Sequence, residues 1–143
     1  MTMTRKMGID YGSVRIGIAI SDPLGITARG IETIRWNGSD MDWAIGRIAE
    51  LCAEHRVDTV IVGLPRRTDG KESPSEQNAR ILAKRVEEAA QVTVILRDER
   101  YTTVLANRIM QETGVRQSKK KAVVDQIAAE IILQDHLNHC HDQ

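Results

Sequence analysis

Phenylalanine is absent from this chain of 143 residues, and aromatic side chains make up only 3% of it. The core must therefore be built mainly from Ile, Val, Leu and Ala, within a hydrophobic fraction of 41%. No apolar run approaches the ~20 residues of a membrane span, and residues 1–6 lack the apolar core of a signal peptide. We expect one cytoplasmic domain over residues 1–143, with a short flexible tail from about residue 139.

The chain has no net charge and only two cysteines. The 20 basic and 20 acidic residues cancel, so nucleic-acid binding would have to come from local basic patches. Cys52 and Cys140 lie far apart and form no C-x-x-C pair, which favours free thiols in a reducing compartment. His136, His139, Cys140 and His141 crowd the C-terminus, but their spacing is not typical of a zinc site.

Hydrophobic periodicity predicts an α/β domain. Strands are expected at residues 6–11, 15–21, 30–36, 57–62 and 92–97, and helices at about 41–55, from 74 through at least 90, 103–113 and 122–139. The first three strands are typical of an antiparallel meander, whereas the later strands follow helical crossovers and should run parallel to a neighbour. The expected fold is a mixed five-stranded sheet flanked by helices on both faces.

Two helix starts have specific capping residues. Ser39 is the expected N-cap of the helix at 41–55. Ser73, Pro74 and Glu76 form the pattern of a capping box with proline in the first helical position. These signals predict where the two helices begin.

Acidic residues occur at three places next to apolar segments, where a charged side chain is unexpected. Asp10 closes an apolar strand beside Gly12, Asp98 and Glu99 end another strand, and Asp125 borders the apolar stripe of the last helix. Desolvated carboxylates are costly without partners, and converging ones repel each other and attract cations. Oxygen ligands of this kind suit Mg²⁺ or Mn²⁺. The pattern predicts a metal-dependent site that cleaves phosphodiesters.

Each carboxylate also has a purely structural interpretation. Asp10 could accept a turn hydrogen bond, and Asp98 could be a surface charge beside a capped helix. Asp125 could simply favour a helix N-terminus, although its helical neighbours are small or apolar: Ala122, Ala128, Ala129 and Ile132. Gln126 and Glu130 are expected on the side away from that stripe.

Basic residues precede the last helix. Residues 114–121 carry four positive charges, on Arg116, Lys119, Lys120 and Lys121, and a mobile loop here could grip a phosphate backbone. A solvated charged loop is the ordinary alternative. At a predicted helix start, Arg100 could pair with Glu99 or hold a phosphate. Thr102 or Thr103 could cap that helix, where the free N–H groups favour a phosphate that Thr102 could contact. Aromatic residues for base stacking are few: Tyr11 and Tyr101 near the predicted site, and Trp36 and Trp43 elsewhere.

Residues 8–22 strongly resemble the opening hairpin of the YqgF (RuvX) family, which belongs to the ribonuclease H-like superfamily. The resemblance continues at residues 61–65, 98–103, 119–121 and 125–129. These segments occur in the family's order and span nearly the whole chain, so together they are far more specific than any one of them.

The resemblance implies a ribonuclease H-like fold and a nuclease proposed to trim the 5′ end of precursor 16S ribosomal RNA. It implies Asp10, Glu99 and Asp125 as catalytic ligands of Mg²⁺ or Mn²⁺, with two ions expected. The neighbouring Asp98 stays open as a substitute or helper for Glu99. Cleavage would leave a 5′-phosphate and a 3′-hydroxyl. The expected partners are precursor ribosomal RNA or structured DNA, and ribosomal particles. The protein is expected to be a monomer or a homodimer and not to bind membranes.

Three other functions remain open at this point. Family members were earlier described as Holliday junction resolvases, which act on branched DNA. An ATP-binding domain of the actin and sugar-kinase superfamily also begins with an acidic, glycine-containing hairpin. A non-catalytic RNA-binding factor for ribosome assembly or transcription would use the same basic surface without cleavage.

Overall fold

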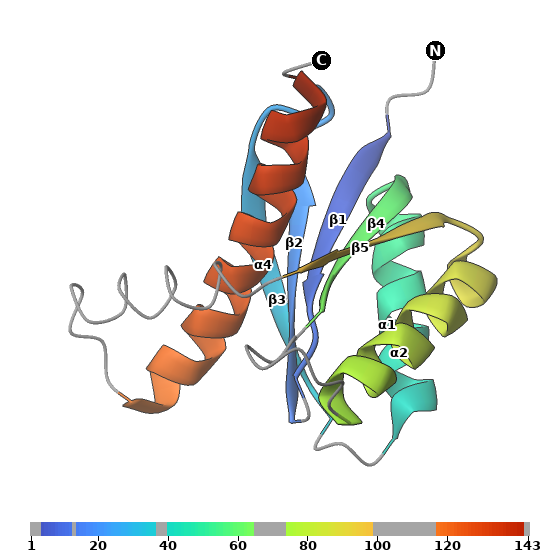
Figure 1. Cartoon of the computed structure of the whole chain (residues 1–143), viewed down its shortest axis with the longest axis vertical. Helices are drawn as coiled ribbons and strands as arrows, with labels where there is room; N and C mark the ends of the chain where they lie inside the picture. The colour runs from blue at the N-terminus through green and yellow to red at the C-terminus, as the bar shows by residue number, and fades with distance from the viewer. Residues whose placement is uncertain (1–3, 13, 37–39, 65–73, 99–116, 142–143) are drawn as a thin grey trace.

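A computed structural model of the protein describes residues 4–12, 14–36, 40–64, 74–98 and 117–141. For Ser75, Asp98 and residues 117–125 and 139–141 it describes the backbone alone. The elements, labelled as in Figure 1, are β1 (Arg5–Asp10), β2 (Arg15–Ser21), β3 (Ala28–Arg35), α1 (Met41–Glu54), β4 (Val57–Leu64), α2 (Pro74–Ala90), β5 (Thr93–Asp98) and α4 (Gln117–His141). The helix predicted at 103–113 lies outside the described residues.

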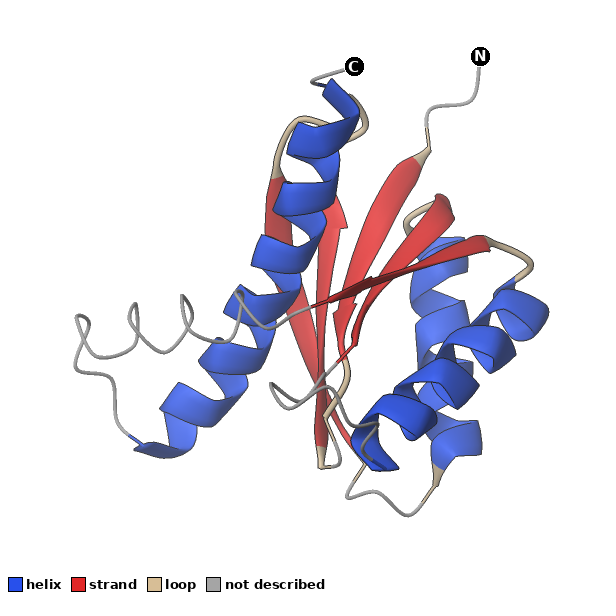
Figure 2. Cartoon of the chain, in the orientation of Figure 1, coloured by secondary structure: helices blue, strands red, loops and turns tan. Residues whose placement is uncertain are grey.

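The five strands form one sheet in the order β3-β2-β1-β4-β5. β1 and β2, like β2 and β3, pair antiparallel, whereas β4 is parallel to both β1 and β5. The predicted mixed sheet is therefore confirmed. Helices α1 and α2 cover one face and α4 crosses the other, so the described chain has three layers (Figure 2).

Strand alternation assigns different kinds of residue to the two faces. On β1, Met7 and Ile9 belong to the main hydrophobic cluster with α1 and α2, so Gly8 and Asp10 fall on the α4 face. The cluster on that second face is smaller and consists of Ala19, Ile61, Ala129, Ile132, Leu133 and Leu137. Bulky apolar residues thus fill one side of the sheet, while small residues line part of the other.

Small residues allow α4 to lie directly on the backbone of β1. A Cβ added to Gly8 would lie 2.6 Å from the carbonyl oxygen of Ala129 and 2.8 Å from Cβ of Leu133. The partner of Gly8 across the β1–β2 ladder is Ala19, another small residue that packs against α4. Since packed interiors leave no room for even one extra methyl group, this stripe fixes how closely the helix approaches the sheet.

A polar row on α4 binds the edge strand β3. Gln126 Nε2 donates to Thr33 Oγ1 at 3.0 Å. One turn later, Glu130 Oε1 accepts from the backbone N–H of Gly30 at 2.6 Å. After another turn, Gln134 Oε1 accepts from the N–H of Ala28 at 2.9 Å. The bonds from Gly30 and Ala28 use backbone donors that an edge strand would otherwise expose, and the whole row covers that edge. Gln126 and Glu130 do leave the apolar stripe, but they face β3.

The start of α1 corrects the predicted cap. Asp40 is the N-cap, and its side chain accepts a hydrogen bond from the N–H of Trp43 at 3.0 Å. A cap must directly precede the first helical residue, here Met41, and Ser39 is one position too early for that role.

Helix α4 is longer than predicted at both ends. It begins at Gln117, where we expected 122, and it continues to His141, where we expected 139. Residues 117–121 contain no glycine or proline, and lysine and glutamine are good helix formers, so nothing in this segment stops the helix. Lys119, Lys120 and Lys121 therefore belong to the start of α4, and the mobile loop predicted to carry them is wrong for these residues. Residues 139–141, which we expected in a flexible tail, belong to α4.

Cys52 is a core residue of α1 with 3% of its surface exposed, and it is a free thiol, as predicted. Burial raises the pKa of this thiol to about 11, so it keeps its proton at neutral pH and is a poor nucleophile. Within the described residues, no helix has the length and apolarity needed to cross a membrane.

Two glycine-to-alanine variants test the contact between α4 and β1. Gly8→Ala should lower the free energy of unfolding by ~1–3 kcal/mol, because the new methyl group would collide with the backbone of α4. Gly46→Ala is the matched control, since an added Cβ on this α1 glycine meets nothing within 4 Å. It should raise stability by up to ~1 kcal/mol through helix propensity. Urea denaturation measures both, and equal stability of Gly8→Ala and the native protein would contradict the packing.

Candidate active site

Asp10 occupies the last position of β1 between two glycines. Its ladder partners are Gly17 on β2 and Gly63 on β4. All three positions belong to the face of the sheet that α4 covers, since they alternate with Ile9, Ile18 and Val62 of the main cluster. The carboxylate is half-buried, and neither of its ladder partners carries a side chain. Glycine at both positions lets an ion or a phosphate group approach the backbone beside Asp10 without meeting a side chain of these two residues.

The second acidic segment reaches the same edge of the sheet. β1, β4 and β5 are parallel, so their carboxyl ends lie together. Across β4, the register joins Asp10 to Gly63 and Gly63 to Arg97, and Asp98 follows as the last residue of β5. One strand separates β1 from β5, so these chain ends lie roughly 10 Å apart, twice the usual strand spacing. Glu99 lies outside the described residues.

Alternation along β5 separates Asp98 from Asp10. Ile95 packs against the α4-face cluster, and Arg97, two residues on, donates to Asp135 of α4 at 2.8 Å. Val94 packs against the main cluster on the other face. The strand position of Asp98 is in phase with Val94, on the face opposite to that of Asp10.

Helix α4 brings the backbone of position 125 towards Asp10. The helix runs antiparallel to β1 and β3, because Gln134, Glu130 and Gln126 meet Ala28, Gly30 and Thr33 in that order. In Figure 1 it begins near the end of the sheet where β1 stops. Ala129 lies over Gly8, and position 125 is one turn earlier, about 5.4 Å along the helix. Asp10 lies two residues beyond Gly8, about 7 Å along the strand in the same direction.

Two aromatic residues hold the turn that follows Asp10. The rings of Tyr11 and Trp36 meet edge to face, with centroids 6.0 Å apart. The indole Nε1–H of Trp36 donates to the carbonyl oxygen of Gly12 at 3.0 Å. A Cβ on Gly12 would overlap the carbonyl of Arg15, so the tight turn requires glycine there. We call Tyr11, Gly12 and Trp36 the aromatic clamp.

The clamp changes the interpretation of both aromatic residues. Tyr11 is 5% exposed and bonded to Asn78 of α2, and burial raises its pKa. It packs inside the molecule, so it is not available for stacking on a base. Trp36, which we placed away from the site, supports it through Gly12. The only sequence signal for this role was its position at the end of an alternating strand.

Several predicted site residues lie outside the described set. They are Glu99, Arg100, Thr102 and Arg116, and the side chains of Asp98, Asp125, Lys119, Lys120 and Lys121. Among the described side chains, no three His, Cys, Asp or Glu residues gather to hold a metal ion. His136, the described member of the C-terminal His and Cys group, is 9% exposed. Asp10 is thus the predicted ligand whose side-chain position is known, and the triad stays a prediction.

Comparisons with known proteins agree on a family and a fold. The family model "RuvX: Holliday junction resolvase" matches residues 4–139. A protein of Acetivibrio thermocellus named "Putative pre-16S rRNA nuclease" is 51% identical over 135 residues, covering 94% of this chain and 95% of its own length. A protein of the same name from Streptococcus equi subsp. equi is 39% identical over 135 residues, covering 94% of this chain and 97% of its own length.

Solved structures give the same fold. RuvC of T. thermophilus, in complex with a Holliday junction substrate, is similar with a TM-score of 0.60 at 17% identity, over 96% of each chain. The ribonuclease H-like fold expected from the sequence is therefore confirmed.

The aromatic clamp predicts unequal effects of two tryptophan substitutions. Trp36→Phe keeps a ring against Tyr11 but removes the N–H that binds Gly12, so unfolding free energy should fall by ~1 kcal/mol or more. Trp43→Phe is the control, because Trp43 is 53% exposed on α1 and should change stability by less than ~0.5 kcal/mol. Chemical denaturation compares them. Equal destabilisation of the two variants would argue against the clamp.

Proposed function

Since this chain belongs to the RuvX (YqgF) family, we propose that it is a nuclease that uses divalent metal ions to process the 5′ end of precursor 16S ribosomal RNA. Family membership makes it a hydrolase of phosphodiester bonds. The observation that carries the proposed chemistry is the position of Asp10. A rigid strand holds this carboxylate at the end of the sheet between Gly17 and Gly63.

The surroundings of Asp10 fit a hard divalent cation. The two ladder partners of Asp10, Gly17 and Gly63, add no side chain next to the carboxylate. Carboxylate oxygens are the ligands that Mg²⁺ and Mn²⁺ prefer. We propose Glu99 and Asp125 as the other ligands, and two bound ions.

Strand alternation favours Glu99 over Asp98 as the second ligand. The position of Asp98 is in phase with Val94, on the face opposite to Asp10. The register of α4 supports Asp125, because this position is one turn before the contact between Ala129 and Gly8.

A pair of bound metal ions would lower the pKa of the attacking water and neutralise the charge that develops on the leaving oxygen. The residues of the chain supply orientation. The aromatic clamp fixes the turn after Asp10, which keeps this carboxylate in one place relative to the scissile phosphate. Lys119, Lys120 and Lys121, at the start of α4, would attract the RNA backbone to the same end of the sheet.

Branched DNA is the second candidate substrate. The description of the family model, which names a Holliday junction resolvase, favours it. The relatives with 39–51% identity carry the ribosomal RNA name, whereas the likeness to RuvC at 17% identity shows the fold alone. We therefore give precedence to precursor 16S ribosomal RNA, a substrate found in the cytoplasm, where ribosomes are assembled.

Replacing Asp10 tests the proposed chemistry. Asp10→Asn keeps the size of the side chain but removes its charge, so Mn²⁺- or Mg²⁺-dependent cleavage should fall by at least ~100-fold while the fold persists. The assay compares precursor 16S ribosomal RNA with four-way junction DNA, each with and without Mn²⁺.

Asp58→Asn is the matched control for this assay. Asp58 is an exposed residue of β4 that accepts a hydrogen bond from Thr4. It follows Val57, the ladder partner of Arg5, so it lies at the end of β4 away from Asp10. This variant should cleave like the native protein. Native-like cleavage by Asp10→Asn would reject the assignment of Asp10, and preferred cleavage of junction DNA would favour the second candidate.

The lysines at the start of α4 have a separate test. Changing Lys119, Lys120 and Lys121 to Ala together should weaken RNA binding and lower the slope of log affinity against log salt by roughly 2, because each phosphate left without its lysine reduces that slope by about 0.7. Lys84→Ala, at an exposed position of α2, should leave the slope unchanged. Fluorescence anisotropy across a salt titration measures both. An unaltered slope in the triple variant would exclude these lysines as the groups that bind RNA.

A further inference from the structure

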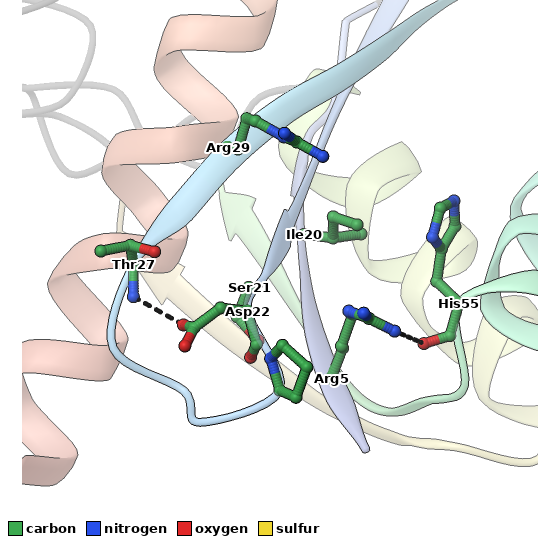
Figure 3. Close-up of a pocket in the computed structure, with 8 residues that line it drawn as sticks. Arg5, Ile20, Ser21, Asp22, Thr27, Arg29 and His55 are labelled. Carbon is green, nitrogen blue, oxygen red and sulfur yellow. Dashed lines mark hydrogen bonds between the residues drawn. The ribbon is translucent and has the colours of Figure 1, made fainter. Parts of the chain in front are cut away.

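A concave site lies at the end of the sheet opposite to Asp10. A cavity of about 470 Å³ is lined by Arg5, Ile20, Ser21, Asp22, Pro23, Thr27, Arg29 and His55 (Figure 3). These residues come from the start of β1, the end of β2, the loop that follows it, the start of β3 and the turn after α1. Asp10 closes the opposite end of β1, so the residues of the proposed nuclease site do not line this cavity.

Two guanidinium groups give the cavity its chemistry. Arg5 donates one hydrogen bond to the carbonyl oxygen of His55 at 3.3 Å. Its guanidinium makes no ion pair with any residue in the described part of the chain. Arg29 makes no ion pair or side-chain hydrogen bond to any described residue. Arginine at such a position is suited to a planar or tetrahedral anion, because its fork of N–H donors matches phosphate geometry.

The carboxylate in the lining is already occupied. Asp22 Oδ1 accepts from the N–H groups of Ile26 at 2.7 Å and Thr27 at 2.8 Å, and Oδ2 accepts from that of Leu24 at 3.2 Å. These backbone bonds, led by that of Thr27, lower the pKa of Asp22, so it stays ionised. Figure 3 shows the carboxylate turned towards Thr27 and away from Arg5. Two arginines against one such aspartate leave the lining with a positive charge.

The remaining lining is partly apolar. Ile20 and Pro23 add hydrocarbon surface beside the arginines. The Ser21 hydroxyl is used by the fold, because it accepts from the N–H of Lys6 and donates to the carbonyl of Asp22. A cavity of this size, with an apolar wall and a few convergent polar groups, is typical of a site for a small molecule.

From this combination we infer that the cavity binds a phosphorylated small molecule of nucleotide size. Arg29 and Arg5 hold the phosphate, and the side chains of Ile20 and Pro23 contact the sugar or base. The five residue steps from Arg5 to Asp10 span about 17 Å, and the two sites lie on opposite faces of the sheet, since Ile20 and Asp10 differ in phase. A free ligand fits this separation better than one RNA strand bound at both sites.

Isothermal titration calorimetry with adenosine 5′-monophosphate tests the site on the full chain. The native protein should bind this probe more tightly than inorganic phosphate, and Arg29→Ala should weaken its binding at least tenfold. Arg29→Lys, which keeps the charge but not the fork of donors, should retain part of the affinity. Arg80→Ala is the matched control, because Arg80 is an exposed arginine of α2 outside the cavity. Since the Arg29 side chain bonds to no described residue, its removal should not impair folding.

A competition with RNA distinguishes a free nucleotide from the phosphates of an RNA backbone as the ligand of the cavity. The Asp10→Asn variant is titrated with the nucleotide in the presence of a single-stranded RNA oligonucleotide that lacks terminal phosphates. Unchanged nucleotide binding supports the inference, and displacement by RNA would assign the cavity to backbone phosphates and overturn it. Absence of nucleotide binding at millimolar concentration, binding no tighter than that of inorganic phosphate, or equal binding by Arg29→Ala would also overturn it. None of these results depends on whether Asp10 supports cleavage.

Discussion

The close contact of α4 with the backbone of β1 and β3 is the constraint on which the rest of this structure depends. Gly8 leaves no space between strand and helix, and the polar row of Gln126, Glu130 and Gln134 fixes the rotation of α4 against β3. A helix held by both packing and hydrogen bonds cannot slide by one turn without disrupting both. The position of residue 125 relative to Asp10 follows from this fixed register.

The two ends of the sheet provide different chemistry. At the carboxyl end of β1, an acidic side chain lies between glycines on the α4 face. At the opposite end and on the other face, Arg5 and Arg29 line a cavity. The first arrangement attracts cations and the second attracts anions, and the length of β1 separates them. The proposed metal site and the inferred phosphate site would therefore not compete for the same charge.

Local patterns were sufficient for some features and misleading for others. Short runs of alternating or continuous apolar residues predicted the five strands, because successive side chains of a strand point to opposite faces and this pattern is visible in adjacent residues. The cap of α1 was wrong by one residue, since Ser39 and Asp40 are both good caps and only the helix start selects between them. The basic segment at 117–121 was predicted to be a loop from its run of positive charge, although its lysines and glutamine favour a helix. Trp36 was missed because its partner, Gly12, is distant in sequence.

The amino-acid sequence alone determined the strand pattern, the acidic residue at the end of β1 and the likeness to a nuclease family, because each is written in contiguous residues. Tertiary structure decided what lies beside those residues. Strand register placed Gly17 and Gly63 next to Asp10, and long-range packing brought Arg5 and Arg29 to one cavity. Register and packing depend on contacts between segments far apart in the chain, and no local pattern encodes those contacts.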